Sequence, residues 1–167
     1  MNKQKAVFLD RDGVINKNRE DYVKSVDEFE IFQEVGESIK KLKENGFLVV
    51  IITNQSAINR GLTTIENIKE IHGILNDYLK EFETKVDGIF ICPHRPDENC
   101  SCRKPKTELF VQAIKEFKID PEKSWMIGDR ETDIQAGQKI GCQCKKLDSK
   151  NSLRDIVNFI ICKKNLL

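Results

Sequence analysis

The sequence has no long hydrophobic run and no excess of charge of either sign. No stretch approaches the length that crosses a membrane, and the apolar run nearest the N-terminus, Ala6–Leu9, is too short for the core of a signal peptide. The 28 basic residues nearly balance the 27 acidic ones, which argues against general binding to nucleic acid or to a membrane surface. We therefore expect a cytoplasmic, monomeric protein whose partner is a small molecule.

Internal repeats, low-complexity segments and linkers are also missing. The 167 residues suffice for one domain with a substantial core, so residues 1–167 are expected to form a single domain. Predicted strands, at residues 6–9, 47–52, 86–92, 125–128 and 142–147, alternate with predicted helices, at residues 33–45, 63–82, 107–117, 133–139 and 152–162. This alternation predicts an α/β fold, a Rossmann-like three-layer sandwich with a mostly parallel sheet.

Polar residues follow the ends of four predicted strands. In chain order they are Asp10 and Asp12, then Thr53 and Asn54, then Cys92 and His94, then Asp129. Because the carboxyl ends of parallel strands meet at one edge of the sheet, four loops should converge on one crevice. Asp10 and Asp12 fall on the same side of an extended backbone. Two carboxylates held that close need a cation, and Mg²⁺ prefers oxygen ligands.

These residue types suit the hydrolysis of a phosphate ester, which needs a nucleophile, a divalent cation, donors for the phosphoryl oxygens and an acid. Asp10 can attack phosphorus and form an aspartyl-phosphate. Asp12 can protonate the leaving oxygen and later activate water. Asp129 can complete the magnesium site beside Asp10. Thr53 can donate its hydroxyl to the phosphoryl group, and Lys104 can supply a fixed positive charge that keeps Asp10 ionised.

A second set of potential metal ligands lies close together in the chain: Cys92, His94, Cys100 and Cys102. Three thiolates and one imidazole form a plausible tetrahedral Zn²⁺ site, and four protein ligands leave no open position, so the site should be structural. A rigid loop of this kind would fix the basic run at residues 103–106 against the crevice, where it could bind phosphate.

Four segments resemble, in order, the motifs of the haloacid dehalogenase-like phosphatases: Asp10-Arg11-Asp12-Gly13-Val14, Thr53-Asn54, Lys104, and Gly128-Asp129 with Asp133. The resemblance covers roughly residues 5–147. It implies that Asp10 is the nucleophile and Asp12 the general acid and base. It also implies that magnesium is held by the carboxylates of Asp10 and Asp129 and by the backbone carbonyl of Asp12.

The zinc loop and the segments at residues 53–55 and 102–105 are similar to one subgroup, whose members lack a large cap domain. It contains D-glycero-D-manno-heptose 1,7-bisphosphate 7-phosphatases, which serve heptose and ADP-heptose precursor synthesis, and histidinol-phosphate phosphatases of histidine biosynthesis. Residues 12–16 and 54–56 favour the heptose enzymes, so cleavage at the C7 phosphate is expected. The short zinc loop and Arg130 favour histidinol phosphate, which stays open as an alternative. The resemblance implies substrate contacts from Asn54, Gln55, Arg60, Arg103 and Lys104.

Two functions of other classes fit less well. A receiver module for signalling also accepts phosphate on an aspartate within a parallel α/β sheet, but its acceptor follows the third strand, where this chain has Cys92-Pro93-His94. A metal-binding interaction module built around the zinc loop would leave the other three loops unexplained. The sequence therefore predicts a magnesium-dependent phosphatase.

Overall fold

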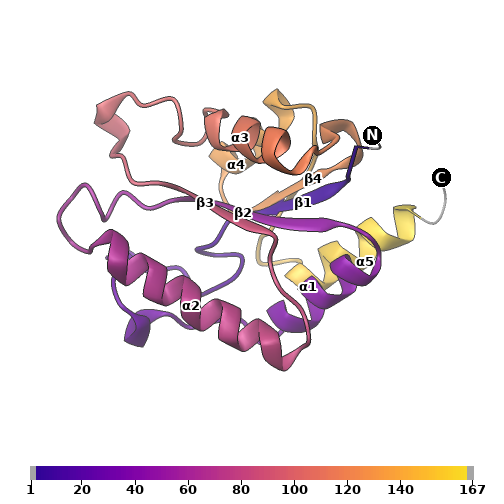
Figure 1. Ribbon diagram of the computed structural model, residues 1–167, viewed down its shortest axis with the longest axis horizontal. Coiled ribbons are helices and arrows are strands. Elements are labelled where there is room, and N and C mark those ends of the chain that lie inside the picture. Colours follow the sequence, from indigo (N-terminus) through magenta and orange to yellow (C-terminus); the bar gives the residue numbers. More distant parts are fainter. Residues whose placement is uncertain (1–2, 165–167) are drawn as a thin grey trace.

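A five-stranded parallel sheet forms the centre of the molecule (Figure 1). The computed structural model describes residues 3–164, with the backbone alone at residue 164. The strands lie in the order β3-β2-β1-β4-β5, so the first strand of the chain is central. Their bounds are β1 (Ala6–Leu9), β2 (Leu48–Asn54), β3 (Gly88–Cys92), β4 (Trp125–Gly128) and β5 (Gln143–Lys146).

Helices cover both faces of this sheet. On one face lie α1 (Val35–Glu44), α2 (Ile65–Glu81) and α5 (Leu153–Lys164), and on the other lie α3 (Glu108–Phe117) and α4 (Glu131–Lys139) (Figure 1). The side chains of β1 alternate between the two resulting cores, with Val7 and Leu9 in one and Ala6 and Phe8 in the other. The predicted three-layer sandwich is confirmed.

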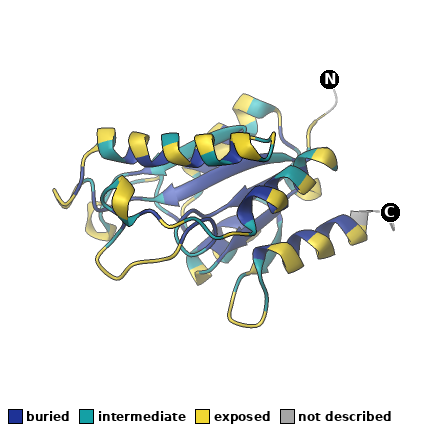
Figure 2. Ribbon diagram, turned by 90° about the horizontal axis from the view of Figure 1, so that it is seen from below, coloured by how far each residue is buried: buried dark blue, intermediate teal, exposed yellow. Residues whose placement is uncertain are grey.

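Burial on both faces explains the composition of the central strands. All four residues of β1 are fully buried, and Figure 2 shows the sheet dark blue beneath helices whose outer faces are yellow. A strand covered on both sides reads as a continuous apolar run rather than as an alternating one. A polar residue at the end of such a strand is therefore held in place by a rigid, dry layer.

Most element boundaries differ from the predicted ones by one or two residues, and two of these differences concern the crevice. β2 continues past residue 52 because Thr53 and Asn54 still pair with Ile91 and Cys92 of β3. α4 begins at Glu131 rather than at residue 133, because the Asp133 carboxylate accepts a hydrogen bond of 3.1 Å from the Arg130 backbone N–H and caps the helix. The sheet and the helix thus place these polar residues directly.

Loops of very different length follow the carboxyl ends of the strands, from residues 129–130 after β4 to residues 10–34 after β1. Within residues 3–164 no segment forms a cap domain over the sheet, and the stretch from β1 to α1 contains only one short 3-10 helix, Val26–Glu28. The same described range holds no helix both long enough and apolar enough to span a bilayer. Access to the strand ends is therefore controlled by loops.

Candidate active site

The carboxyl ends of β1, β2 and β4 open into a cleft of about 970 Å³. Asp10 directly follows β1, and its backbone N–H donates a hydrogen bond of 3.0 Å to the carbonyl of Ile127 in β4. The cleft lining includes Asp10, Asp12, Asn54 and Lys104. Residues from all four predicted loops line the cleft, the third and fourth loops through Arg103 and Arg130. The predicted residues Thr53, Cys92, His94 and Asp129 are not among the lining residues.

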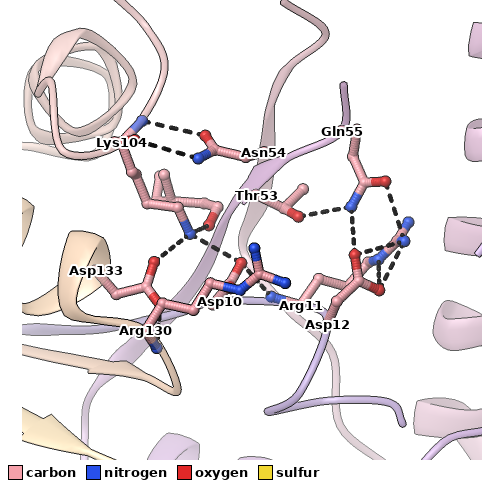
Figure 3. A network of polar contacts seen from close by, with 10 residues as sticks. Asp10, Arg11, Asp12, Thr53, Asn54, Gln55, Lys104, Arg130 and Asp133 are labelled. Atoms are coloured by element: carbon pink, nitrogen blue, oxygen red, sulfur yellow. Dashed lines mark hydrogen bonds and ion pairs between the residues drawn. The ribbon is translucent and has the colours of Figure 1, made fainter. Parts of the chain in front are cut away.

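Lys104 lies between two carboxylates at the floor of this cleft. Its Nζ is 2.8 Å from Oδ1 of Asp10, 2.8 Å from Oδ1 of Asp133 and 2.6 Å from the carbonyl oxygen of Ile52 (Figure 3). The Lys104 side chain is 1% exposed. A second donor, the backbone N–H of Arg11, reaches the same Asp10 oxygen at 2.8 Å. Both contacts hold Asp10 through Oδ1, which fixes the direction of its other carboxylate oxygen.

The charge on Lys104 is not sufficient to keep Asp10 in its ordinary titration range. Burial raises the pKa of Asp10 to about 6, the Asp133 and Asp12 charges add to the rise, and Lys104 opposes it. For Lys104 itself, burial lowers the pKa, but the carboxylates of Asp10 and Asp133 outweigh burial and raise it. This group of residues therefore contains more buried negative charge than one ammonium compensates.

Asp12 belongs to a separate network that faces away from Lys104 (Figure 3). Its Oδ1 accepts from Nε and Nη2 of Arg11 at 3.1 and 2.8 Å and from Nδ2 of Asn16 at 2.9 Å. Its Oδ2 accepts from Nη2 of Arg11 at 3.0 Å and from Nε2 of Gln55 at 2.8 Å. Burial raises the pKa of Asp12, but the Arg11 charge and the bonds from Asn16 and Gln55 outweigh it, so the net pKa lies below the usual value.

The two aspartates of the first motif thus have opposite environments. Asp10 is buried beside a second carboxylate, and its pKa is raised, whereas Asp12 is paired with a guanidinium, and its pKa is lowered. Neighbouring carboxylates whose pKa values are driven apart are suited to different chemical roles.

Thr53 and Asn54 of β2, together with Gln55 directly after the strand, connect these networks. The Thr53 hydroxyl accepts from Nε2 of Gln55 at 2.8 Å. The Asn54 amide contacts the main chain of Lys104 twice, through Oδ1 at 3.1 Å and Nδ2 at 3.3 Å. Gln55 is 2% exposed and is not among the residues that line the cleft. Its amide donates to Asp12 and Thr53, and the substrate contact that the resemblance implies stays a prediction.

A cluster of three carboxylates at the cleft floor fits a divalent cation. Ligand oxygens of Asp10, Asp129 and Asp133 lie within 4.8 Å of one another, and Oδ1 of Asp129 is buried without a hydrogen-bond partner among the described residues. Burial and the nearby Asp133 charge raise the pKa of Asp129. Gly13 allows the approach, since a Cβ there would lie 2.3 Å from Oδ2 of Asp129. The charge imbalance and the free oxygen both call for a cation.

Cys92, His94, Cys100 and Cys102 also come together, in the loop after β3. The Cys102 sulfur is 3.1 Å from that of Cys92, 3.5 Å from that of Cys100 and 3.1 Å from Nδ1 of His94. Tetrahedral zinc with Zn–S bonds of about 2.3 Å separates its sulfurs by about 3.8 Å. Burial raises the pKa of the Cys92 thiol far above its usual value, a cost that a bound cation would remove.

Three arginine side chains, Arg60, Arg103 and Arg130, line the cleft. Arg60 and Arg130 are exposed and Arg103 is half-buried, so we call this solvent-accessible part of the lining the entrance. Arg60 lies 6.0 Å from the ring centre of Tyr22, and Nη1 of Arg103 donates to the carbonyl of His94 at 3.1 Å. The link from Arg103 to His94 ties one of the entrance cations to the cysteine loop.

Sequence reasoning missed two important members of the site. Asp133 was placed in the fourth motif but not among the metal ligands, and its position in the first turn of α4 was the available signal. The sequence assigns no role to Arg11, although an arginine inside a buried motif needs a partner. The partner proves to be the adjacent carboxylate of Asp12.

Comparisons with known proteins agree with this geometry. A family model described as haloacid dehalogenase-like hydrolase matches residues 4–141. The chain is 43% identical over 164 residues to D-glycero-beta-D-manno-heptose-1,7-bisphosphate 7-phosphatase from Helicobacter pylori, over 98% of this chain and 94% of the relative. The protein of the same name from Haemophilus ducreyi is 40% identical over 151 residues, 86% of this chain and 82% of the relative.

A solved structure extends the likeness to three dimensions. The crystal structure of D,D-heptose 1,7-bisphosphate phosphatase from B. bronchiseptica, complexed with magnesium and phosphate, matches with a TM-score of 0.87 and 29% identity. The match covers 95% of this chain and 99% of that one.

Proposed function

Because this chain belongs to the haloacid dehalogenase-like hydrolase family, we propose that it is a phosphatase that removes the C7 phosphate of D-glycero-D-manno-heptose 1,7-bisphosphate. The relatives of that name match the chain over nearly its full length. The observation that carries the proposal is the pair of separate networks around Asp10 and Asp12 at the floor of one cleft.

We propose the roles of Asp10 and Asp12 from the resemblance of the first motif; Asp12 enters the reaction in its protonated form, against the lowering of its pKa by Arg11. We propose that an Asp10 carboxylate oxygen attacks phosphorus and forms an O–P bond. The bond from phosphorus to the C7 oxygen breaks, and that oxygen keeps the electron pair and takes a proton from Asp12. Water then attacks the aspartyl-phosphate and gives a proton to Asp12, and the bond from Asp10 to phosphorus breaks. The products are inorganic phosphate and the free C7 alcohol, and both aspartates return to their starting states.

Magnesium is the cation that the carboxylate cluster suits. We propose that Asp10 and Asp129 hold the ion through carboxylate oxygens and that Asp12 holds it through its backbone carbonyl. The Asp133 carboxylate lies beside these ligands. When bound, the ion supplies positive charge opposite the phosphoryl oxygens. Lys104 adds a second positive charge on the side of Asp10 that faces β2, and we propose that it also contacts the phosphoryl group, together with the Thr53 hydroxyl.

For the substrate, we propose different roles for the predicted contacts. Arg60 and Arg103 lie at the entrance, where a guanidinium can pair with the second phosphate. The amides of Asn54 and Gln55 already contact Lys104 and Asp12. We therefore propose that both residues hold the catalytic groups and that Asn54, which lines the cleft, also contacts the substrate.

We also propose that residues 1–167 act as one cytoplasmic domain and as a monomer. The six cysteines are all free, as is usual in a reducing compartment, and the two helical layers share one sheet.

The proposed activity is tested by phosphate release, in the presence of Mg²⁺, from both heptose bisphosphate anomers, histidinol phosphate and simple sugar phosphates. We expect the bisphosphate to exceed histidinol phosphate by about 100-fold or more in kcat/KM, and phosphorus NMR should show heptose 1-phosphate as product. Preference for histidinol phosphate would overturn the substrate alone. Turnover of none of these compounds would overturn the enzyme.

We also propose that the cysteine loop binds a structural zinc ion through Cys92, His94, Cys100 and Cys102. Cys102→Ser is expected to abolish stoichiometric zinc and to lower the melting temperature by about 10 °C, since the metal contributes folding free energy. Metal analysis of freshly purified, reduced protein and thermal unfolding measure both effects. Cys162→Ser, an exposed cysteine of α5, is the control and should keep its zinc. Absence of zinc from the unmodified protein would exclude the site.

A further inference from the structure

Arg11 is the largest fully buried side chain in the described structure. A guanidinium stays charged, so removing it from water is costly unless its partners compensate for the lost hydration. Here Nε and Nη2 form three hydrogen bonds with the two oxygens of Asp12. A forked contact of this kind fixes the orientation of a carboxylate as well as its charge.

Groups from other segments hold Arg11 in this position. Nη2 also donates to Oε1 of Gln55 at 3.1 Å, and the guanidinium lies 5.7 Å from the ring centre of Phe29. His72 of α2 is also buried and interacts electrostatically with Arg11. It is 7% exposed, and its Nε2 has no partner among the described residues. Burial and the Arg11 charge lower the pKa of His72 to about 4. At neutral pH His72 is therefore uncharged and does not repel the guanidinium of Arg11.

We propose that Arg11 is a positioning residue for proton transfer. It holds the carboxyl group of Asp12 in the orientation from which Asp12 can pass a proton to the leaving oxygen. The proposal rests on the proposed phosphatase activity. Arg11 does not line the cleft, so it acts through Asp12 rather than on substrate. Asn16 supports the same orientation through its bond to Oδ1 of Asp12.

The nature of the leaving group separates this role from a purely structural one. When the bond from phosphorus to the C7 oxygen breaks, an alkoxide forms unless Asp12 delivers its proton in the same step. An aryl phosphate releases an aryl oxide, which is stable without that proton. A displaced Asp12 therefore slows phosphoryl transfer to Asp10 from the sugar phosphate and leaves transfer from the aryl phosphate almost unchanged. A general loss of structure slows both.

The experiment is rapid-quench measurement of aspartyl-phosphate formation by Arg11→Lys, with heptose bisphosphate and with 4-nitrophenyl phosphate. Lysine keeps the charge but lacks the planar fork. We expect transfer from the bisphosphate to slow by about 100-fold with KM within about twofold, and transfer from the aryl phosphate to stay within about threefold. Arg154→Lys, at an exposed site on α5, is the matched control and should behave like the unmodified enzyme.

A double-mutant cycle with Asp12→Asn completes the test. If Arg11 acts through Asp12, Arg11→Lys should slow the Asp12→Asn enzyme no further. Equal loss on both substrates, multiplying losses in the cycle, or no loss would each overturn the proposal. Should Arg11→Lys fail to fold, Asn16→Ala carries the test, with a leaving-group-selective loss of about tenfold expected and an equal loss on both substrates contradicting it. An unmodified enzyme without turnover would instead overturn the proposed function.

Discussion

Replacement of Asp10 by asparagine is expected to reduce phosphate release by about 10⁴-fold or more, because an amide oxygen does not attack phosphorus. The folded structure should survive. Asparagine keeps an oxygen that can accept from Lys104 and from the Arg11 backbone, the two contacts made by Oδ1. Burial disfavours the Asp10 charge, so its removal should not lower the melting temperature in metal-free buffer, and zinc content should be unchanged.

Turnover of heptose bisphosphate, thermal unfolding with EDTA and metal analysis together measure these effects. Asp77→Asn, at an exposed position on α2, is the control and should retain full activity. Mass spectrometry must verify that asparagine at residue 10 has not deamidated, since a small aspartate fraction would mimic residual turnover. A variant that keeps more than about a tenth of the normal rate excludes Asp10 as the nucleophile.

The fold was predictable because the strands of this sheet are apolar on both sides. Val7, Leu9 and their neighbours in β1 are fully buried, so a short hydrophobic run followed by carboxylates identifies both a central strand and its functional end. The convergence of Asp10, Thr53 and Asp129 followed from strand parity and the parallel topology. None of it required knowledge of side-chain contacts.

The partners of individual polar groups were not predictable in the same way. The contact between Arg11 and Gln55 joins residues 44 positions apart in the chain, and it depends on the register of β1 against β2. No periodicity in the sequence indicates which way the Gln55 amide turns. The role of Asp133 depends on where α4 begins, and helix boundaries are uncertain by a few residues.

Lys104→Met is expected to have the second large effect, on stability as well as on turnover. The side chain is buried between Asp10 and Asp133, and methionine of similar size leaves two carboxylates without a compensating cation. Removal of one partner of a buried ion pair lowers the free energy of unfolding by about 3–5 kcal/mol. Phosphate release should also fall by about 10³-fold, since a preorganised charge beside the phosphoryl group is lost. Urea unfolding and turnover with Mg²⁺ measure the two effects, and Lys123→Met, at an exposed lysine, is the control.

The double variant Lys104→Met/Asp133→Asn tests the cause of the instability. If unpaired negative charge is responsible, removal of one carboxylate should restore about 2 kcal/mol of the free energy of unfolding. Turnover should stay low, because the double variant lacks both the ammonium and the carboxylate that caps α4. Lys104→Met as stable as the unmodified protein would show that the attraction of Lys104 for its carboxylates only balances the cost of burying it. Recovery of stability in the double variant is the expected result, and it would assign the instability of Lys104→Met to the carboxylates that it leaves without a cation.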